Sequence, residues 1–154
     1  MDRVELAYRL RRFLPDDAVV DQEEALRPFE TDGLTAYRRR PCVVALPANV
    51  DEVRAVVRFC ARHRVPLVPR GAGTGLSGGA LPDEAGVLLV LSKMQRILEI
   101  DPERRLARLE PGVRNLAVSE AAAPLGFFYA PDPSSQIACS IGGNVAENSG
   151  GVHC

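Results

Sequence analysis

The stretch Val65-Pro-Leu-Val-Pro-Arg-Gly-Ala-Gly-Thr-Gly-Leu-Ser-Gly-Gly-Ala-Leu-Pro82 decides how the rest of this chain is interpreted. A short apolar run ends at Pro69, Arg70 follows, and five of the next nine residues are glycine. Glycine adopts positive φ and lets other groups approach the backbone closely, and successive N–H groups in such a turn can form a concave anion site. Arg70 adds a cation with several donors that suit phosphate, and Thr74 and Ser77 add hydroxyls. We therefore predict a loop that holds a diphosphate.

Two common glycine motifs describe this loop less well. A Walker A loop requires Gly-Lys followed by Ser or Thr, and no lysine is present here. Residues 73–78 match G-x-G-x-x-G, but a dinucleotide fingerprint also needs a helix whose N-terminus holds the pyrophosphate. Gly79 and Pro82 leave no room for that helix, so we reject the Rossmann interpretation. A flexible glycine hinge remains the alternative, and Arg70 with the two hydroxyls counts against it.

Composition places limits on the function. The chain has 154 residues and is 46% hydrophobic, enough for about one domain with a real core. A formal net charge of −1 gives no electrostatic case for binding nucleic acid or an acidic membrane surface. The N-terminus lacks the features of a signal peptide, and no apolar run reaches the roughly 18 residues of a membrane span. We expect a cytoplasmic location, with any attachment to the inner membrane made through partners.

The residues that bind metals are sparse and scattered. No C-x-x-C pair occurs, so we predict no metal site and expect free thiols rather than disulfides. The residues concerned are Cys42, Cys60, Cys139, Cys154, His63 and His153. We expect Cys60 to be a core thiol and His63 to interact with the carbonyl groups at a helix end.

The sequence of residues 1–69 predicts two helices followed by a strand–helix–strand unit. An amphipathic pattern predicts a helix over 3–14, with an apolar face of Val4, Leu6, Leu10, Phe13 and Leu14. A second short helix is predicted over 21–27, and residues 28–40 are expected to be irregular. A buried strand over 42–46 precedes a helix over 49–63, which Asn49 caps together with Glu52. The apolar stripe of that helix is predicted to comprise Val50, Val53, Val56, Val57, Cys60 and Ala61.

A strand over 65–69 then leads directly into the glycine loop. This order brings the loop to the carboxyl end of a strand, where ligand crevices of α/β sheets usually lie. Further strands are predicted over 86–91, and over 97–100 and 105–110 as an antiparallel hairpin. A helix over 115–123 and a short strand over 127–130 complete the pattern.

The segment from Asn115 to Cys154 contains no Lys or Arg and is punctuated by glycine. Such a segment suits a wall packed against a large planar ligand. An ordinary buried helix with glycine ends is the alternative.

Two blocks of this sequence resemble a known family. Pro69-Arg-Gly-Ala-Gly-Thr-Gly-Leu-Ser-Gly-Gly-Ala80 is similar to the pyrophosphate loop of FAD-linked oxidases of the vanillyl-alcohol oxidase and p-cresol methylhydroxylase (PCMH) type. Residues 131–154 form a second similar block, in the expected order. The branch most similar to this chain comprises D-lactate dehydrogenase and the flavin-binding subunit of glycolate oxidase. Members of the family are about three times longer, so the resemblance implies a truncated chain.

The resemblance implies an α+β (α/β-like) fold, a PCMH-type FAD-binding domain with two small mixed sheets and flanking helices. Residues 1–40 would form an N-terminal helical segment, and 41–110 the first FAD-binding subdomain with the pyrophosphate loop. Residues 111–154 would begin the second subdomain, after the turn Glu110-Pro111-Gly112.

The resemblance also implies the residues that contact the cofactor. The first block would wrap the pyrophosphate and ribityl chain through Pro69, Arg70, Gly71, Ala72, Gly73, Thr74, Gly75, Leu76 and Ser77. The second block would line the flavin through Pro131, Asp132, Ser134, Ser135, Cys139, Gly142 and Gly143, with Asn144, Asn148 and Gly151 near the ribityl chain or adenine. The catalytic residues are expected outside this chain. His153 is the only candidate base in the second block and is expected to be structural.

The implied cofactor is FAD, held non-covalently because residues 69–82 contain no histidine for a covalent link. The implied activity is oxidation of a 2-hydroxy acid, of the glycolate or D-lactate type, to a 2-oxo acid. The complete protein would have partners such as an iron–sulfur protein. The alternative is a non-catalytic α/β binding module, or a fragment of a split protein, that keeps the fold without activity.

Overall fold

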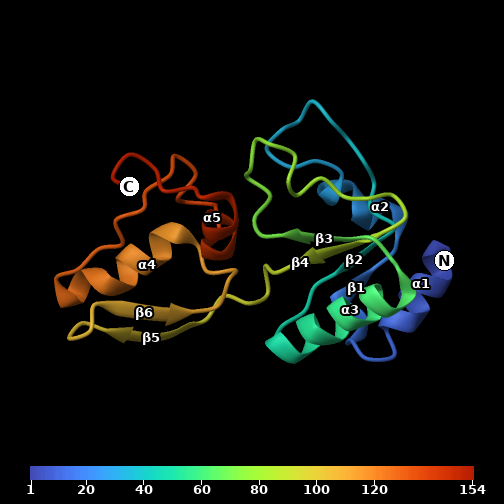
Figure 1. The fold of residues 1–154 in the computed structure, drawn as a ribbon, viewed down its shortest axis with the longest axis horizontal. Helices are drawn as coiled ribbons and strands as arrows, with labels where there is room; N and C mark the ends of the chain where they lie inside the picture. The colour runs from blue at the N-terminus through green and yellow to red at the C-terminus, as the bar shows by residue number, and fades with distance from the viewer. The chain divides into compact units, whose positions relative to one another are not determined.

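The computed structural model describes residues 1–154 and divides into two compact units, Met1–Lys93 and Met94–Cys154 (Figure 1). The first unit contains the four-stranded sheet and the second contains a two-stranded sheet. The predicted α+β architecture with two small sheets and flanking helices is therefore confirmed. The assignment of 41–110 and 111–154 to two FAD-binding subdomains stays a prediction.

The sheet of the first unit is mixed. Its strand order is β1 (Val19–Val20), β2 (Val43–Ala45), β4 (Val87–Val90) and β3 (Leu67–Arg70). Strand β1 is antiparallel to β2, whereas β2 and β3 both run parallel to β4. Since β4 lies between the two strands of the strand–helix–strand unit, β3 is an edge strand. Short, β-branched runs buried on both faces are typical of parallel strands, and β2 and β4 are fully buried.

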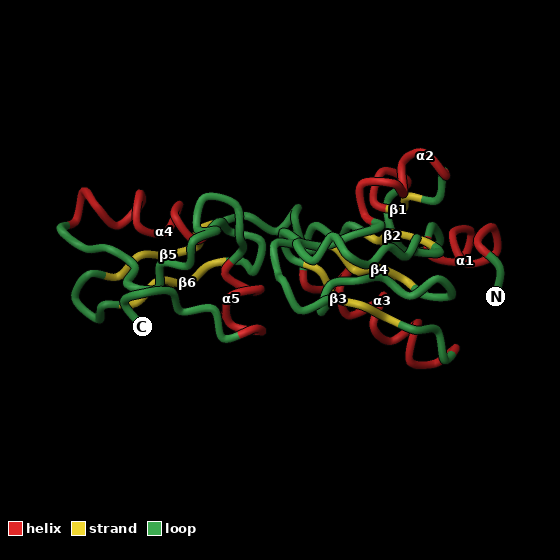
Figure 2. Tube along the Cα trace, turned by 90° about the horizontal axis from the view of Figure 1, so that it is seen from above, coloured by secondary structure: helices red, strands yellow, loops and turns green.

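Helices cover both faces of this sheet (Figure 2). Helices α1 (Arg3–Leu10) and α3 (Val50–His63) pack on one face, in a core that includes Leu6, Leu10 and Val56. Helix α2 (Glu23–Leu26) and the 3-10 turn Arg27–Phe29 cover the other, around Leu26 and Leu88. The N-terminal segment is thus part of this unit's core.

The first predicted helix is shorter than expected. The α-helix ends at Leu10 and a turn carries the chain to Pro15. Leu6 and Leu10 are buried as predicted, but Val4 is 78% exposed and Ala7 is buried in its place. The prediction for Val4 was wrong because Ala7 lies one turn from Leu10 on the side that meets the sheet. The second helix is also shorter, and a 3-10 turn over Asp16–Ala18 was not predicted.

Helix α3 begins as the sequence predicted. The Asn49 side-chain oxygen accepts the Glu52 N–H at 2.9 Å, and the Glu52 carboxylate accepts the Ala48 N–H at 2.7 Å. These reciprocal bonds satisfy donors that a helix start leaves free.

The buried stripe of α3 is narrower than predicted. Val56 and Cys60 are buried, but Val50 is 52% exposed and Val57 is 42% exposed. Ala61 is exposed as well. The predictions for Val50, Val57 and Ala61 were wrong because the buried positions of α3, Val56 and Cys60, are four residues apart and form one narrow row. Burial raises the pKa of the Cys60 thiol to about 11, as expected for a core cysteine.

The second unit begins with the predicted hairpin. Strands β5 (Ile97–Asp101) and β6 (Leu106–Leu109) pair antiparallel. Helix α4 (Asn115–Ala122) follows, continues as a 3-10 turn over Ala123–Leu125, and is succeeded by α5 (Ile141–Glu147). Helix α5 shows that the glycine-punctuated segment includes a short helix.

The strand predicted over 127–130 is absent. The Tyr129 N–H donates to the Ser119 hydroxyl at 2.9 Å, and the Phe127 N–H donates to the Ala122 carbonyl at 3.3 Å. These bonds tie the segment to α4, so its donors are not available to a neighbouring strand.

Nowhere does the structure contain a helix long and apolar enough to cross a membrane.

Candidate functional site

The glycine loop leaves the sheet of the first unit at its carboxyl edge. It follows β3 directly, and Arg70, the last residue of that strand, pairs with Val90 at the end of β4. Residues 71–86 contain no helix, which confirms the rejection of the Rossmann interpretation. The loop therefore emerges where two parallel strands end, the usual place for a ligand in such sheets.

The backbone of this loop keeps its donors free. None of the N–H groups of residues 71–76 donates a hydrogen bond to another group of the protein. Most backbone donors in a folded protein are paired, so six consecutive unpaired donors need an external partner. Water serves in its absence, and an anion such as a diphosphate matches a set of N–H donors.

Arg70 lies beneath this loop. Its guanidinium donates to the Thr31 carbonyl at 2.6 Å and lies 6.0 Å from the centre of the Phe29 ring. Gly73 has φ +72° and sits directly against the guanidinium, so that a Cβ there would overlap it. Burial lowers the pKa of Arg70, and the nearby carboxylate of Asp32 opposes that shift. The arginine is thus held inside the protein by a carbonyl, with no salt bridge to a carboxylate, and its contact with phosphate stays a prediction.

Residues 31–34 complete this arrangement, and no sequence pattern indicated it. A Cβ on Gly33 would lie 2.6 Å from the Thr74 carbonyl oxygen and 2.7 Å from that of Gly75, so the two backbones touch. Asp32 is only 5% exposed, and its Oδ1 accepts the Leu34 N–H at 2.9 Å. Its Oδ2 is buried without a hydrogen-bond partner. The sequence predicts only an irregular segment here, because no periodic pattern marks a contact that depends on backbone.

The other predicted residues of the first block lie at the end of β3 or on the outer part of the loop. Pro69 belongs to β3, whereas Ala72 and Ser77 are exposed and Leu76 is 74% exposed. An exposed leucine next to free N–H groups is available to contact a ligand.

In the second unit, the predicted residues around Asp132 are tied together by backbone contacts. The Asp132 N–H donates to the Gly150 carbonyl at 2.9 Å. Gly151 has φ +81° and leaves no space for a Cβ, which would lie 2.6 Å from the Pro133 nitrogen. The Pro131 carbonyl accepts from the buried Asn115 side chain at 3.0 Å.

The Asp132 carboxylate is also engaged. It accepts the His153 N–H at 3.1 Å and lies 2.6 Å from His153 Nδ1. The backbone bond from His153, followed by the imidazole, lowers the pKa of Asp132. His153 thus contacts Asp132 through both its backbone and its ring, and its structural role stays a prediction.

Helix α5 presents two buried polar groups without partners. Asn144 is 6% exposed and its Nδ2 has no acceptor, and Ser140 is 4% exposed with an unpartnered hydroxyl. Gly142 packs against Pro111, because a Cβ there would lie 2.7 Å from the proline Cβ. Asn144 was predicted as a site residue. Ser140 was not, although its place just before Gly142 and Gly143 was a usable signal.

The remaining predicted residues of the second block shape its backbone. Cys139 is buried, and the Ser135 carbonyl accepts N–H groups of both Ala138 and Cys139 at 2.8 Å. Ser134 is exposed, and Asn148 ends α5 in the left-handed conformation at φ 54°. Gly143 lies next to Ser140, since a Cβ there would be 3.3 Å from its hydroxyl. A role for these residues against a flavin stays a prediction.

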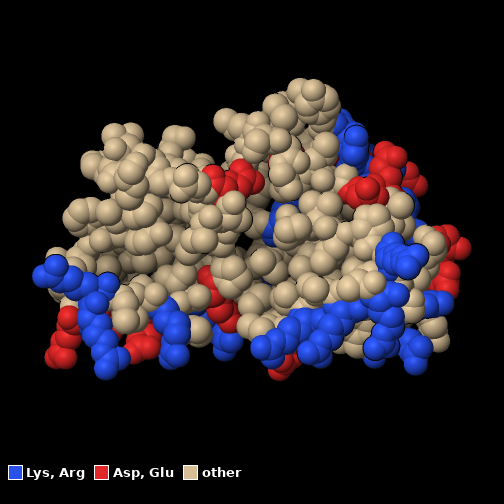
Figure 3. Space-filling model, in the orientation of Figure 1, with Lys and Arg blue, Asp and Glu red and all other residues tan.

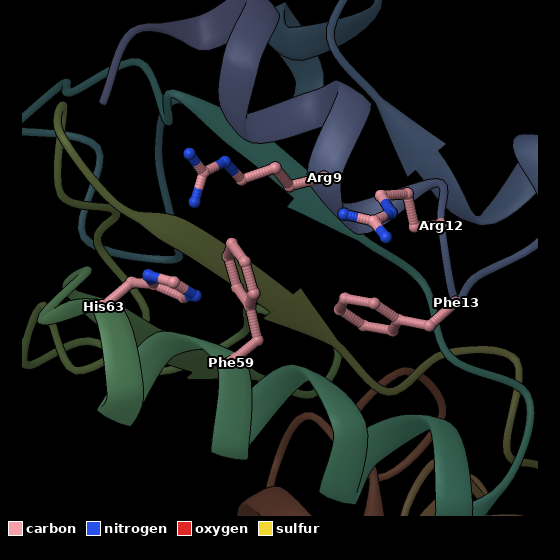
Figure 4. Close-up of a pocket in the computed structure, with 5 residues that line it drawn as sticks. All are labelled: Arg9, Arg12, Phe13, Phe59 and His63. Carbon is pink, nitrogen blue, oxygen red and sulfur yellow. The ribbon is translucent and has the colours of Figure 1, made fainter.

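A separate hollow of about 400 Å³ lies between α1 and α3 (Figure 4). Phe59 lies between Phe13 and His63, with ring centres 5.7 and 4.7 Å away and the rings tilted, and Arg9 and Arg12 face them. Basic side chains also gather over α3 (Figure 3). Since α3 runs opposite to the parallel strands, His63 lies near their amino ends, at the other edge from the glycine loop. The hollow is therefore not part of the loop's site.

The fold and the two glycine-rich blocks define an FAD-binding domain. Residues 41–154 match the FAD binding domain family, and the chain belongs to that family. FAD is its cofactor. The free N–H groups of residues 71–76 fit the diphosphate of such a ligand.

The chain is similar along its whole length to one group of flavoproteins. It is 58% identical over 154 residues to glycolate oxidase subunit GlcD of Escherichia coli (strain K12), covering all of this chain and 31% of that protein. It is 45% identical over 124 residues to GlcD of Bacillus subtilis (strain 168), covering 80% of this chain and 26% of that protein. It is 35% identical over 149 residues to D-lactate dehydrogenase of Anaerostipes hadrus, covering 96% of this chain and 31% of that protein. The chain thus spans between 26% and 31% of the length of these relatives.

Solved structures agree on the fold. An alkyldihydroxyacetonephosphate synthase structure superimposes with a TM-score of 0.82 at 21% identity, covering 96% of this chain and 32% of that one. A p-cresol methylhydroxylase structure gives a TM-score of 0.66 at 25% identity, covering 84% and 27% of the two chains. The expected PCMH-type fold and the resemblance to this superfamily are confirmed.

Proposed function

We propose that this chain is the pyrophosphate-binding part of a flavoenzyme that oxidises a 2-hydroxy acid, of the glycolate or D-lactate type, to a 2-oxo acid. The observation that carries the proposal is 58% identity over the whole chain to a protein named glycolate oxidase subunit GlcD. Relatives named D-lactate dehydrogenase support the same substrate class. When bound, FAD would accept the hydride from the substrate.

The residues of this chain would bind and orient the cofactor. The N–H groups of residues 71–76 would hold the diphosphate, and Arg70 beneath them would add positive charge. In the second unit, Asn144 Nδ2 and Ser140 Oγ would donate to polar atoms of the cofactor. Binding would be non-covalent, because residues 69–82 offer no histidine for a covalent link. The catalytic residues would lie outside residues 1–154, and partner proteins would bind the complete protein.

Titration of the purified chain with FAD tests the proposal. We expect quenching of flavin fluorescence to saturate, and FAD to raise the unfolding temperature, because a ligand that binds only the folded state stabilises it. We expect the variant Gly73→Ala to bind FAD more weakly, because its Cβ would overlap the Arg70 guanidinium and distort the loop. Gly126→Ala is the control, because Gly126 shares a positive φ but has no heavy atom within 4 Å of its Cβ position.

Failure of the unaltered chain to bind FAD would favour a non-catalytic α/β module that keeps the fold.

Acid precipitation tests the mode of binding. We expect the flavin to stay in the supernatant, and flavin that precipitates with the protein would contradict non-covalent attachment.

A further inference from the structure

We propose that Asp32 is a cofactor-binding residue, and that residues 29–34 form a second wall of the FAD site opposite the glycine loop. This inference rests on the proposed FAD binding. The matched family region begins at residue 41, so this segment lies outside it. The proposed ligand for Asp32 is a sugar hydroxyl of FAD, from either the ribityl chain or the ribose.

The first step is the contact between the two segments. Gly33 touches the backbone of Thr74 and Gly75, and Leu34 approaches Gly78 to 3.9 Å of its Cβ position. Arg70 fixes the same segment by donating to the Thr31 carbonyl at 2.6 Å. Whatever ligand the loop's free N–H groups bind therefore lies beside residues 31–34.

The second step is the state of the Asp32 carboxylate. It is 95% buried, one oxygen accepts the Leu34 N–H, and the other has no partner. A buried charged oxygen without a donor is costly. The neighbouring Arg70 offsets the charge but donates its hydrogen bond to Thr31 instead. The free oxygen needs a donor from outside the protein.

The third step is the chemistry of that donor. The diphosphate of FAD offers only acceptors, whereas its ribityl chain and ribose offer hydroxyl donors on either side of it. A carboxylate oxygen accepting a hydroxyl makes a charge-assisted bond, about twice as strong as a neutral one. An acidic residue on a ribose hydroxyl is a known way of holding a dinucleotide. A sugar hydroxyl is therefore the partner that fits.

Asp32→Asn tests this assignment. Asparagine keeps the size of the side chain and the oxygen that accepts the Leu34 N–H, but removes the charge. We expect it to weaken FAD binding about tenfold, because the oxygen that would accept the sugar hydroxyl becomes an amide NH2 donor and the charge-assisted bond is lost. Asp83→Asn is the matched control. Asp83 Oδ1 accepts the Ala85 N–H at 2.8 Å, which is the same kind of turn as Asp32 forms with Leu34, but at an exposed site. We expect that control to leave FAD binding unchanged.

Titrations with ADP and FMN identify the hydroxyl. Weakened ADP binding with unchanged FMN binding would assign it to the ribose, and the reverse would assign it to the ribityl chain. Unchanged or tighter FAD binding by the Asp32 variant would overturn the inference and leave the proposed function intact. Equal weakening of all three ligands together with a lower unfolding temperature without ligand would also overturn it, since that is the result of a structural role. If the unaltered chain binds no FAD, the proposed function and this inference both fail.

Discussion

Two glycine-rich stretches, residues 70–79 in the first unit and 139–151 in the second, use the same residue type differently. In the first, Arg70 supports the backbone from beneath, and the N–H groups of residues 71–76 stay free. In the second, Gly142 and Gly151 allow close packing against Pro111 and Asp132, and the free polar groups belong to side chains. Glycine therefore exposes donors in one unit and permits tight contact in the other, and composition alone does not distinguish these uses.

The largest expected effect is on the tight contact. Gly151→Ala adds a Cβ against the backbone of residues 132 and 133 at φ +81°. Left-handed strain costs about 1–2 kcal/mol and overpacking costs about 1–3 kcal/mol. We therefore expect the free energy of unfolding, measured with urea, to fall by roughly 3 kcal/mol. Gly126→Ala has the strain without the overlap and should lose only about 1–2 kcal/mol. Equal losses would show that packing does not explain Gly151.

The next effect concerns the support beneath the glycine loop. Arg70→Ala removes a half-buried guanidinium and its bond to Thr31. Without FAD, we expect it to lower the free energy of unfolding by about 2 kcal/mol, since hydrogen bonds of charged groups contribute about 1.5–3 kcal/mol. Arg58→Ala, at an exposed position of α3, should change it by less than about 0.5 kcal/mol. Equal stability of both variants would mean that Arg70 does not support the loop.

A smaller difference separates the two helix starts. Asn49→Ala should cost about 1 kcal/mol, because the Asn49 side chain caps α3. Arg114 is the N-cap of α4 but makes no side-chain cap bond; the first N–H groups of α4 donate instead to the Cys139 and Gln136 carbonyls at 3.0 Å. Arg114→Ala should therefore cost less than about 0.5 kcal/mol. Thermal unfolding of both variants tests the difference, and a larger loss for the Arg114 variant would contradict it.

The smallest effect is on pH dependence. Hydrogen bonds from the Arg96 side chain, then from its backbone, lower the pKa of Glu110, and Arg11 lowers that of Asp21 in the first unit. A carboxyl with a lowered pKa in the folded state stabilises it above the unfolded pKa, and this contribution disappears as pH falls through the folded value. Stability should thus fall as pH drops below about 4.5, the ordinary value for Glu110.

Glu110→Gln should reduce the loss of stability in acid. The test is the unfolding temperature measured from neutral pH to pH values below about 4.5. Glu103→Gln, on the exposed turn of the same hairpin, is the control and should leave the dependence unchanged. An unchanged acid dependence in the Glu110 variant would contradict the assignment.

Features that depend on neighbours in the sequence were predictable. The cap of α3 by Asn49 and Glu52, the hairpin over 97–110 and the loop after β3 all follow from spacing of a few residues. Predictions failed where packing between elements decides the outcome. Val4 is exposed because Ala7 faces the sheet, and the strand over 127–130 is absent because Ser119 binds Tyr129.

The glycine loop, its position after a strand and its likeness to FAD-linked oxidases were evident from the amino-acid sequence, because these features lie in contiguous motifs. The folded chain was needed to show that Arg70 lies beneath the loop, that Gly33 touches Thr74 and Gly75, and that one oxygen of Asp32 is buried without a partner. These features arise where segments about forty residues apart meet, and the partners on one side are backbone carbonyls, which have no signature in the side-chain pattern.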